Sequence, residues 1–495
     1  MKKYIKNIVP VAALLLTMGT ATSCVGDLDV TPINPNIQTG LNIDGLFNKC
    51  YANFALAGNG GANGDCDIDG IDGGTSGFVR QTFNANELPT DEAICGWGDD
   101  GIAGFCYNSY NASNPMLIGL YARITTGIAY CNQYLAEAGD QDATKLAEIR
   151  FLRAYEYFSL MDGWGNIPFT LQPLTKPERY TRAQVYEWLE KELLEIEPSL
   201  SDAKAKKSTD AGYGRVDKAA CWLLLSRLYL NAEVYTGTPQ WEKAKSYAKK
   251  VMDSSYKLNT KSVNGWSAYQ MLFMGDNGET DAAYEGIFPL LQDGLKTTSW
   301  GTTLFLLAST YDQDMHANPN NPSATNGTDQ AWGGNRARPD LVKKFFPNGN
   351  VPNLESYATA KAAGDDRALF NGVNRSLDND DVSTFKSGFG VAKFTNFKTD
   401  GSAGKDATFP DADFFLMRAA EAYLNFAEAD ARINGGETTA EGTAAINAIR
   451  KRANTSTRED RGYSLNDICD EWSREFYFEG RRRMDLIRFN RYGGN

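Results

Sequence analysis

The sequence contains a single histidine, His316, among 495 residues. Nucleophilic catalysis of the Ser-His-Asp and Cys-His types needs an imidazole beside a second catalytic group, and zinc sites commonly use several imidazoles. One histidine in the loop stretch 311–316 meets neither requirement. These enzyme and zinc-site classes are therefore disfavoured, and we expect His316 to be a surface residue.

Cysteine pairs of the C-x-x-C type are also absent, although the chain has eight cysteines. Four of them lie in apolar, helix-like contexts and are expected to be small core residues: Cys50, Cys131, Cys221 and Cys469. Cys66, Cys95 and Cys106 lie in loops. A single disulfide among these three is compatible with an exported protein, but the spacing does not choose a pair.

Basic residues are in deficit, with 50 Lys and Arg against 62 Asp and Glu, a net charge of -12 and a pI near 4.9. The Lys/Arg run Arg481–Arg483, near the C-terminus, has acidic residues on both sides. Proteins that bind nucleic acid need the opposite charge balance. We therefore expect no nucleic-acid partner and a neutral or cationic ligand instead.

The N-terminus has the pattern of a bacterial lipoprotein export signal. Lysines precede an apolar run over residues 9–18, and small residues lead to Cys24. The run is roughly half of the ~20 residues that a membrane-spanning helix needs, and nothing after Cys24 is apolar enough to span. We predict a signal peptide over residues 1–24 and a membrane anchor through lipidated Cys24. A plain signal peptide with an incidental cysteine is the alternative.

Apolar residues recur every three or four positions along much of the chain, which predicts amphipathic helices. The expected helices are 41–56, 115–139, 143–161, 181–200, 216–234, 241–252, 413–433, 439–453, 465–478 and 482–489. Elsewhere, stretches rich in Gly, Asn, Asp and Thr favour turns and loops. We predict a mainly α fold in a single domain over 25–495, with helical repeats at roughly 41–253 and 413–490 and a loop-rich, ligand-binding part at roughly 60–110 and 254–410.

Two of these helices share a finer pattern. Trp222-x-x-Leu-Ser-x-x-Tyr229 matches the first helix of a tetratricopeptide repeat, and 416–423 repeats the spacing. Each is followed by an alanine-bearing helix, around 244–251 and 444–449, and 153–157 is a weaker third case. Such helix hairpins stack because one pair cannot bury its apolar face alone. Unrelated packed helices with coincidental spacing are the alternative.

Nine tryptophans divide into two groups by their neighbours. Most lie in helical apolar stripes or at a helix end and are expected to be structural. Trp97, Trp300 and Trp332 lie in segments with almost nothing else apolar. Such an indole either anchors its loop or faces a ligand, and the apolar face of a sugar ring suits an aromatic plane while nearby polar groups suit its hydroxyls. The sequence context does not choose between a loop anchor and a sugar-binding surface.

Acidic clusters leave two further options open. Asp276, Asp411 and Asp413 carry oxygen atoms of the kind that bind calcium, although capping of a helix by Asp413 is the simpler account. A pair of carboxylates at the correct separation would also suit a glycoside hydrolase. The sequence gives no distances, so this enzyme class stays open here.

Several longer segments resemble the SusD/RagB family of surface glycan-binding lipoproteins. They are 147–158, 164–168, 214–220, 418–428 and 474–486. Segments 86–92, 228–237 and 292–297 are similar to starch-binding members in particular. The resemblance implies about four tetratricopeptide-like helix pairs, no enzymatic activity and no cofactor. It also implies a lipoprotein exposed at the cell outer membrane, bound to a SusC-like TonB-dependent transporter, with starch or α-glucan oligosaccharides as ligand.

The resemblance also implies a glycan-binding site. Its aromatic arc corresponds to Trp97, Trp300 and Trp332, with polar partners of the sugar hydroxyls at Asp72 and Arg80. Two positions depart from the starch-binding pattern: Trp300 stands where a Tyr is found, and Asp100 where an Asn is found. Lys296, in the loop before Trp300, is a further candidate donor.

The C-terminal region carries two more expectations. Members of the family continue for some tens of residues past the motif at 485–488, so the chain is expected to be a fragment that stops at Asn495. Its charged residues Arg474, Glu475, Glu479 and Arg481 are expected to form a structural network. Against the α-glucan binder stand three alternatives: a binder of another glycan, an acid-pair glycoside hydrolase, and a helical scaffold that binds only protein.

Overall fold

The computed structural model describes residues 42–493 apart from 63, 65, 140, 141 and 322. The chain separates into a short unit that ends at Leu46 and a large unit over Phe47–Asn495, which holds every element from α3 onward. The predicted signal peptide and Cys24 lie outside the described residues. Among those that are described, no helix has the length and apolar character needed to cross a membrane.

Helices make up most of the regular structure in the described part of the chain, which confirms the mainly α prediction. In the first half they are α2 (Ile43–Ala52), α3 (Phe78–Asn86), α4 (Ile102–Cys106), α5 (Pro115–Glu137), α6 (Ala143–Trp164), α7 (Arg182–Ile196), α8 (Lys218–Leu230), α9 (Ala232–Thr236) and α10 (Trp241–Met252). In the second half they are α11 (Thr303–Ser309), α12 (Pro339–Lys343), α13 (Ser356–Ala363), α14 (Ala419–Ile433), α15 (Ala440–Arg452), α16 (Leu465–Phe476) and α17 (Arg482–Arg488).

The strands are short and form two-stranded antiparallel ladders. They are β1 (Ala93–Cys95) with β5 (Asn335–Ala337), β2 (Ile167–Phe169) with β3 (Glu178–Tyr180), β4 (Gly286–Leu290) with β8 (Phe414–Arg418), and β6 (Phe370–Asn371) with β7 (Gly390–Val391). Three of the four ladders join segments within the loop-rich part or tie that part to β8. They therefore fix long loops in place rather than form a large sheet.

Helix boundaries follow local capping chemistry. Asn114 precedes α5, where its side chain accepts hydrogen bonds from the Met116 and Leu117 N–H groups and Pro115 occupies the first turn. Thr181 and Gln184 form a capping box at the start of α7, and Ser464 begins α16 in the same way. These caps satisfy backbone donors that a helix start leaves unpaired.

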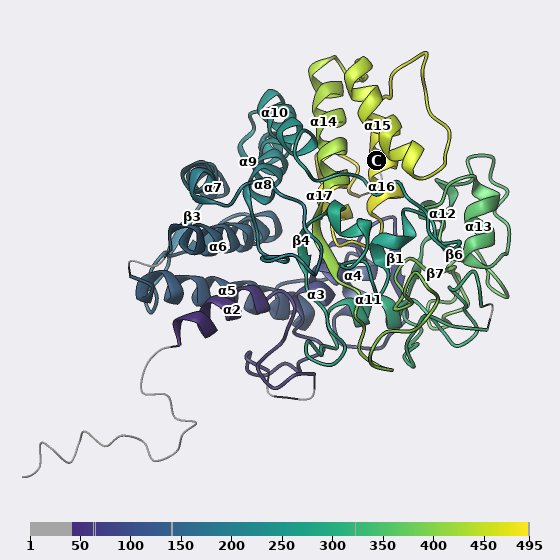
Figure 1. The fold of residues 1–495 in the computed structure, drawn as a ribbon, viewed down its shortest axis with the longest axis horizontal. Helices are drawn as coiled ribbons and strands as arrows, with labels where there is room; N and C mark the ends of the chain where they lie inside the picture. Colours follow the sequence, from purple (N-terminus) through teal and green to yellow (C-terminus); the bar gives the residue numbers. More distant parts are fainter. Residues whose placement is uncertain (1–41, 63, 65, 140–141, 322, 494–495) are drawn as a thin grey trace, which may run out of the picture. The chain divides into compact units, whose positions relative to one another are not determined.

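Consecutive helices pack as hairpins and then stack. α5 packs on α6, α6 on α7, α8 on α10 and α14 on α15, while α10 contacts α14 directly and joins the two helical stretches. Figure 1 shows α5 to α10 in succession on one side and α14 to α17 beside them, with the loop-rich part opposite. Small residues allow these close approaches, since the Ser226 hydroxyl of α8 donates to the Ala244 carbonyl of α10 over 2.9 Å. The predicted hairpins 222–229 with 244–251 and 416–423 with 444–449 are confirmed as packed pairs, with one change to the second.

That change is at residues 413–418. The helix expected over 413–433 begins only at Ala419, because β8 occupies Phe414–Arg418 and pairs with β4. Asp413 therefore precedes a strand and does not cap a helix. The helix expected over 216–234 is likewise interrupted at Asn231, which separates α8 from α9.

The cysteine and histidine predictions have mixed outcomes. Cys50, Cys131, Cys221 and Cys469 are buried as expected. The seven cysteines of the described range are free thiols, and the loop residues Cys95 and Cys106 are buried too, so no disulfide links the candidates there. His316 is half-buried rather than a plain surface residue, and its Nδ1 atom is enclosed by protein.

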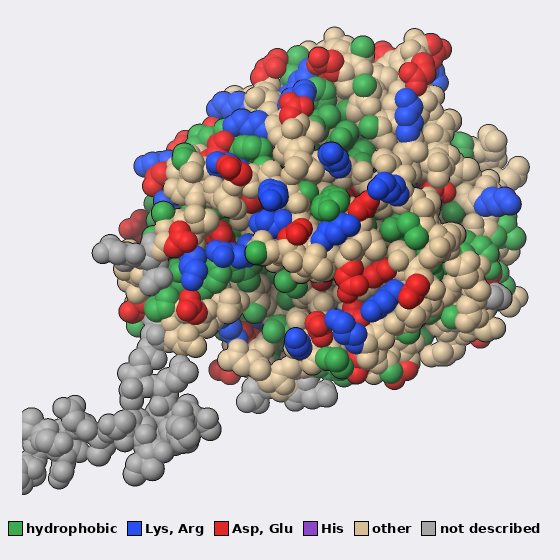
Figure 2. Space-filling model, in the orientation of Figure 1, with side chains coloured by type: hydrophobic (Ala, Val, Ile, Leu, Met, Phe, Trp, Pro, Cys, Tyr) green, Lys and Arg blue, Asp and Glu red, His purple; other side chains and the backbone are tan. Residues whose placement is uncertain are grey.

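A buried network of ion pairs stabilises the C-terminal part. Arg418, at the end of β8, contacts Glu475 over 2.6 Å, Glu479 over 2.8 Å and Glu285 over 3.0 Å. The predicted charge network is confirmed in this region, where Arg474 pairs with Glu471 and Arg481 pairs with Asp485. At the surface, by contrast, Figure 2 shows basic and acidic side chains intermixed over the visible face.

Candidate functional site

The β1–β5 ladder brings Trp97 and Trp332 together. Cys95 pairs with Asn335, so the chain leaves β1 toward Trp97 at the end of the ladder where it enters β5 from Trp332. The Gly96 N–H donates to the Gly334 carbonyl over 3.2 Å and extends the pairing by one step. Gly334 is required here, because a Cβ atom at this position would lie 2.2 Å from Cε2 of Trp97. The indole of Trp97 thus packs directly against the backbone of Gly334.

Helix α11 positions the other side of the site. All its residues are buried, and Trp300 lies just before its first turn. At its C-terminal end, the backbone carbonyls of Ala308 and Ser309 accept hydrogen bonds from Trp332 N–H over 2.7 Å and Gly334 N–H over 2.8 Å. The backbones of Trp300 and Trp332 therefore lie at opposite ends of one short helix. Figure 1 shows this helix, α11, within the loop-rich part.

Together the three indoles form a continuous row, which we call the aromatic arc. Ring centroids of Trp97 and Trp332 lie 6.3 Å apart with the planes tilted by 50°, and those of Trp332 and Trp300 lie 6.2 Å apart with a tilt of 44°. All three side chains are half-buried, so each indole keeps part of its surface in solvent. Tilts of this size mean that the row is not flat.

Two of the predicted polar partners border the arc. Arg80, on α3, places its guanidinium carbon 5.6 Å from the centroid of the Trp97 ring and pairs with Asp99 over 2.9 Å. Burial lowers the pKa of Arg80, while the charges of Asp99 and Asp72 act in the opposite direction. The helix is set against Trp300 because Arg80 N–H donates to the Gly301 carbonyl over 3.0 Å.

Asp72 lies beside Trp300. A Cβ atom at Gly74 would be 3.0 Å from Cβ of Trp300 and 3.2 Å from Oδ1 of Asp72, so the three residues adjoin. Asp72 accepts a hydrogen bond from Thr75 N–H over 2.9 Å. Against the effect of partial burial, the hydrogen bonds from Thr75 and the charge of Arg80 lower the pKa of Asp72. Asp72 is exposed and ionised at neutral pH, able to accept hydrogen bonds from hydroxyl groups.

The remaining two candidates are exposed side chains in turns. Asp100 is exposed in the turn between β1 and α4, and Lys296 is exposed in a turn where its N–H donates to the Asp293 carbonyl over 2.9 Å. Their role in a binding site stays a prediction.

Sequence reasoning missed three residues that adjoin the arc. Asp99 pairs with Arg80, Gln330 accepts a hydrogen bond from Trp332 Nε1 over 2.8 Å, and the Phe409 ring lies 5.0 Å from the Trp300 ring. Phe409 had the same signal as the tryptophans, since it is a large apolar residue in a polar stretch. Asp99 and Gln330 had no signal, because acids and amides are common in every loop of this chain.

The calcium candidates are engaged by hydrogen-bond donors of the protein. Asp411 accepts from Gly294 N–H and Lys405 N–H, both over 2.9 Å, and Asp413 from Gln292 N–H and the Tyr213 hydroxyl, both over 2.7 Å. In Asp276 one oxygen accepts from Thr399, and only Oδ1 is buried without a partner. Over the described range there is no group of three or more His, Cys, Asp or Glu side chains arranged for a metal ion. Calcium binding by these residues stays a prediction.

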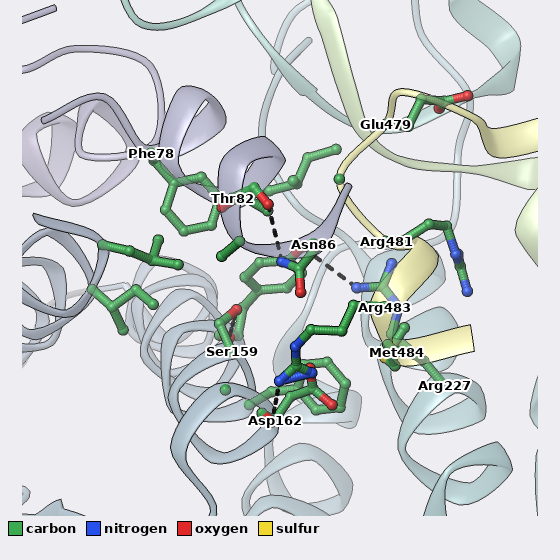
Figure 3. Close-up of a pocket in the computed structure, with 18 of the residues that line it drawn as sticks. Phe78, Thr82, Asn86, Ser159, Asp162, Arg227, Glu479, Arg481, Arg483 and Met484 are labelled. Atoms are coloured by element: carbon green, nitrogen blue, oxygen red, sulfur yellow. Dashed lines mark hydrogen bonds and ion pairs between the residues drawn. The ribbon is translucent and has the colours of Figure 1, made fainter. Parts of the chain in front are cut away.

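A separate cavity of ≈ 170 Å³ lies between α3, α5, α6 and the 479–484 segment (Figure 3). Its walls include Phe78 and Phe158, together with several charged groups that are paired. Arg483 donates to the Asp162 backbone carbonyl over 3.0 Å, and Arg227 forms a two-point pair with Glu421 over 2.6 and 2.7 Å. It contains none of the predicted site residues, so it is not part of the aromatic arc.

Comparison with known proteins places the chain in a family. The SusD family profile matches residues 307–495. The chain is 39% identical over 533 positions to the starch-binding protein SusD of Bacteroides thetaiotaomicron, with 100% of this chain and 92% of that protein covered.

Solved structures share the fold. A crystal structure with xylogluco-oligosaccharide matches with a TM-score of 0.65 at 17% identity, covering 90% of this chain and 83% of that one. A laminarin-binding SusD-like protein matches with a TM-score of 0.63 at 19% identity, covering 92% of each chain. At these identities the structures show the fold alone, whereas the full-length match to SusD shows family membership. The chain belongs to the SusD family.

Proposed function

We propose that this protein binds starch and related α-glucan oligosaccharides on the aromatic arc, without catalysis. The observation that carries the proposal is the row of three half-buried indoles with centroid distances of 6.3 and 6.2 Å and tilts of 50° and 44°. Sugar rings lay their apolar C–H faces on aromatic planes. Arg80, a donor beside Trp97, and Asp72, an acceptor beside Trp300, are suitable partners for sugar hydroxyls.

The tilts favour a curved ligand. Chains of α-1,4-linked glucose coil, so successive glucose rings change direction along the chain, whereas extended β-linked chains present flatter ribbons. A row of rings that turns by 44° to 50° from one to the next suits the coil better. Starch binding by the 39% identical relative supports the same choice.

Affinity electrophoresis tests this proposal. The native protein is run through gels that contain amylopectin, mannan or xylan, with a non-binding protein as the mobility reference. We expect retardation by amylopectin alone. Retardation by mannan or xylan and not by amylopectin would point to another glycan, and a release of reducing sugar from soluble starch would support the hydrolase alternative.

We further propose that the protein is lipidated at Cys24, displayed at the outer membrane, and delivers bound glycan to a SusC-like TonB-dependent transporter. The support is the family membership and the lipoprotein pattern of residues 1–24. Expression of Cys24→Ala should release the protein from the membrane fraction into the soluble fraction. Retention of the variant in the membrane would argue against the anchor.

A further inference from the structure

Beyond the three tryptophans, the aromatic row continues to Phe409. Its ring centroid lies 5.0 Å from that of Trp300, with the planes tilted by 59°. This spacing and tilt are similar to those between the neighbouring indoles, and the Phe409 side chain is also half-buried. Phe409 therefore keeps part of its side chain exposed to solvent next to Trp300.

The loop that carries Phe409 is held by its own hydrogen bonds. Oδ1 of Asp406 accepts from the N–H groups of Thr408 over 2.8 Å and Phe409 over 2.9 Å. These bonds lower the pKa of Asp406, which keeps the carboxylate ionised and the turn closed at neutral pH. The ring is thus fixed by its backbone before any ligand arrives.

A chain of hydrogen bonds joins this loop to the loop of Trp332. Asp329 N–H donates to the Ala407 carbonyl over 2.7 Å, and the Thr408 hydroxyl donates to Oδ1 of Asp329 over 3.0 Å. Gln330 then bridges the two sides, since its Nε2 donates to Asp329 over 2.7 Å and its Oε1 accepts from Trp332 Nε1 over 2.8 Å. The two loops, distant in sequence, are fastened as one unit along the edge of the row.

We propose that Phe409 and Asp329 form an additional sugar subsite that extends the aromatic arc past Trp300. This inference rests on the proposed function. The ring of Phe409 receives the apolar face of one further glucose unit, and the exposed carboxylate of Asp329 accepts a hydrogen bond from a hydroxyl of that unit. The site therefore favours longer α-glucan chains over short ones.

Chain length provides the test. Binding of maltotriose and maltoheptaose is measured by isothermal titration calorimetry for the wild-type protein and for Phe409→Ala, Phe409→Tyr and Asp329→Asn. A trisaccharide can be held by the three tryptophans and Arg80, while the longer chain also reaches Phe409. For Phe409→Ala we expect a roughly 3- to 10-fold loss of affinity for maltoheptaose, the range of a lost aromatic contact, with little change for maltotriose.

The other variants distinguish direct sugar binding by Phe409 from a purely structural role. Phe409→Tyr keeps the ring and should bind like the wild type, and Asp329→Asn should weaken maltoheptaose selectively. Phe489→Ala is the matched control, since this half-buried phenylalanine follows α17 and contacts Arg432 and Arg488 instead of the arc. It should leave both affinities unchanged.

Two results would overturn the subsite. An equal loss for both sugars in Phe409→Ala would mean that the ring only supports Trp300, and no loss for either sugar would mean that it has no part in binding. If Phe409→Ala does not fold, as judged by its melting temperature, Asp329→Asn decides by the same comparison of lengths. A wild-type protein that binds neither sugar would instead refute the proposed function.

Discussion

The pKa of the buried Asp413 carboxyl group is set by its surroundings. It lies immediately before β8, 8% exposed, and accepts hydrogen bonds from the Tyr213 hydroxyl and Gln292 N–H. Burial raises the pKa of Asp413 to about 7, and these hydrogen bonds offset the effect only in part. In the unfolded chain the same group titrates near its ordinary value of 3.8. Folding and protonation are therefore linked at this residue.

The first prediction follows from the sign of this linkage. Between about pH 4 and pH 7 the folded protein holds a proton that the unfolded chain releases, so Asp413 makes the free energy of unfolding fall as the pH rises through this range. Asp413→Asn stays neutral and should lack this decrease. Each unit of pKa difference corresponds to roughly 1.4 kcal/mol. The difference in the free energy of unfolding between the wild type and Asp413→Asn should therefore change by a few kcal/mol across the range.

Urea unfolding at pH 4.5 and pH 7.5 measures this gap. Asp202→Asn is the control, because the Asp202 carboxylate is exposed and its substitution should change stability little at either pH. A gap between Asp413→Asn and the wild type that is the same at both values would contradict the assignment of a raised pKa to Asp413.

At the scale of elements, the arc depends on a three-residue ladder and a seven-residue helix. The β1–β5 register sets Trp97 against the backbone at Gly334, and α11 sets the separation of Trp300 and Trp332. None of these elements is long enough to be stable alone, and each is held by contacts with the others. The relative placement of the indoles is thus a property of several elements together.

The second prediction concerns Gly334→Ala. The added methyl group would lie 2.2 Å from the Trp97 ring and must displace the indole or the loop. We expect roughly a tenfold or greater loss of α-glucan affinity, the equivalent of about 1.4 kcal/mol. The overall fold should persist. Gly98→Ala, one residue after Trp97, meets no atom within 4 Å and should bind like the wild type. Unchanged calorimetric affinity in Gly334→Ala would show that Trp97 does not need its present position.

Much of the helical architecture was predictable, because periodic segments such as α5, α7 and α16 carry both an apolar stripe and recognisable ends. Strand β8 was not, since only Arg418 separates its apolar run from the apolar residues of α14, and the pairing with β4 depends on residues far away in the chain. The site tryptophans stood out by context, but their order, with Trp332 between Trp97 and Trp300, comes only from the fold.

At the scale of the whole molecule, buried charges connect the loop-rich part to the C-terminal helices. Arg418 is fully buried and contacts Glu285, Glu475 and Glu479, while Arg452 also pairs with Glu285 and Glu475. Glu475 has its pKa lowered to about 2, because the charges of Arg452 and Arg418 outweigh the effect of burial. Removal of one cation would leave buried carboxylates without compensation.

The third prediction is that Arg418→Met lowers the free energy of unfolding by about 3 to 5 kcal/mol, as for other broken buried ion pairs. Lys249→Met is the control, because Lys249 and Asp253 form an exposed pair on one helix that is worth at most about 0.5 kcal/mol. Chemical denaturation of both variants gives the comparison. Equal stability of the two would mean that the buried network contributes no more than a surface pair.

The central claim, that the aromatic arc binds α-glucan, is tested most directly by titration calorimetry with maltoheptaose. The wild type and Trp241→Ala, which removes a half-buried tryptophan of α10, should bind alike, whereas Trp97→Ala and Trp332→Ala should each lose roughly tenfold or more in affinity. Wild-type binding that survives unchanged in both arc variants, or its absence in the wild type, would contradict the account.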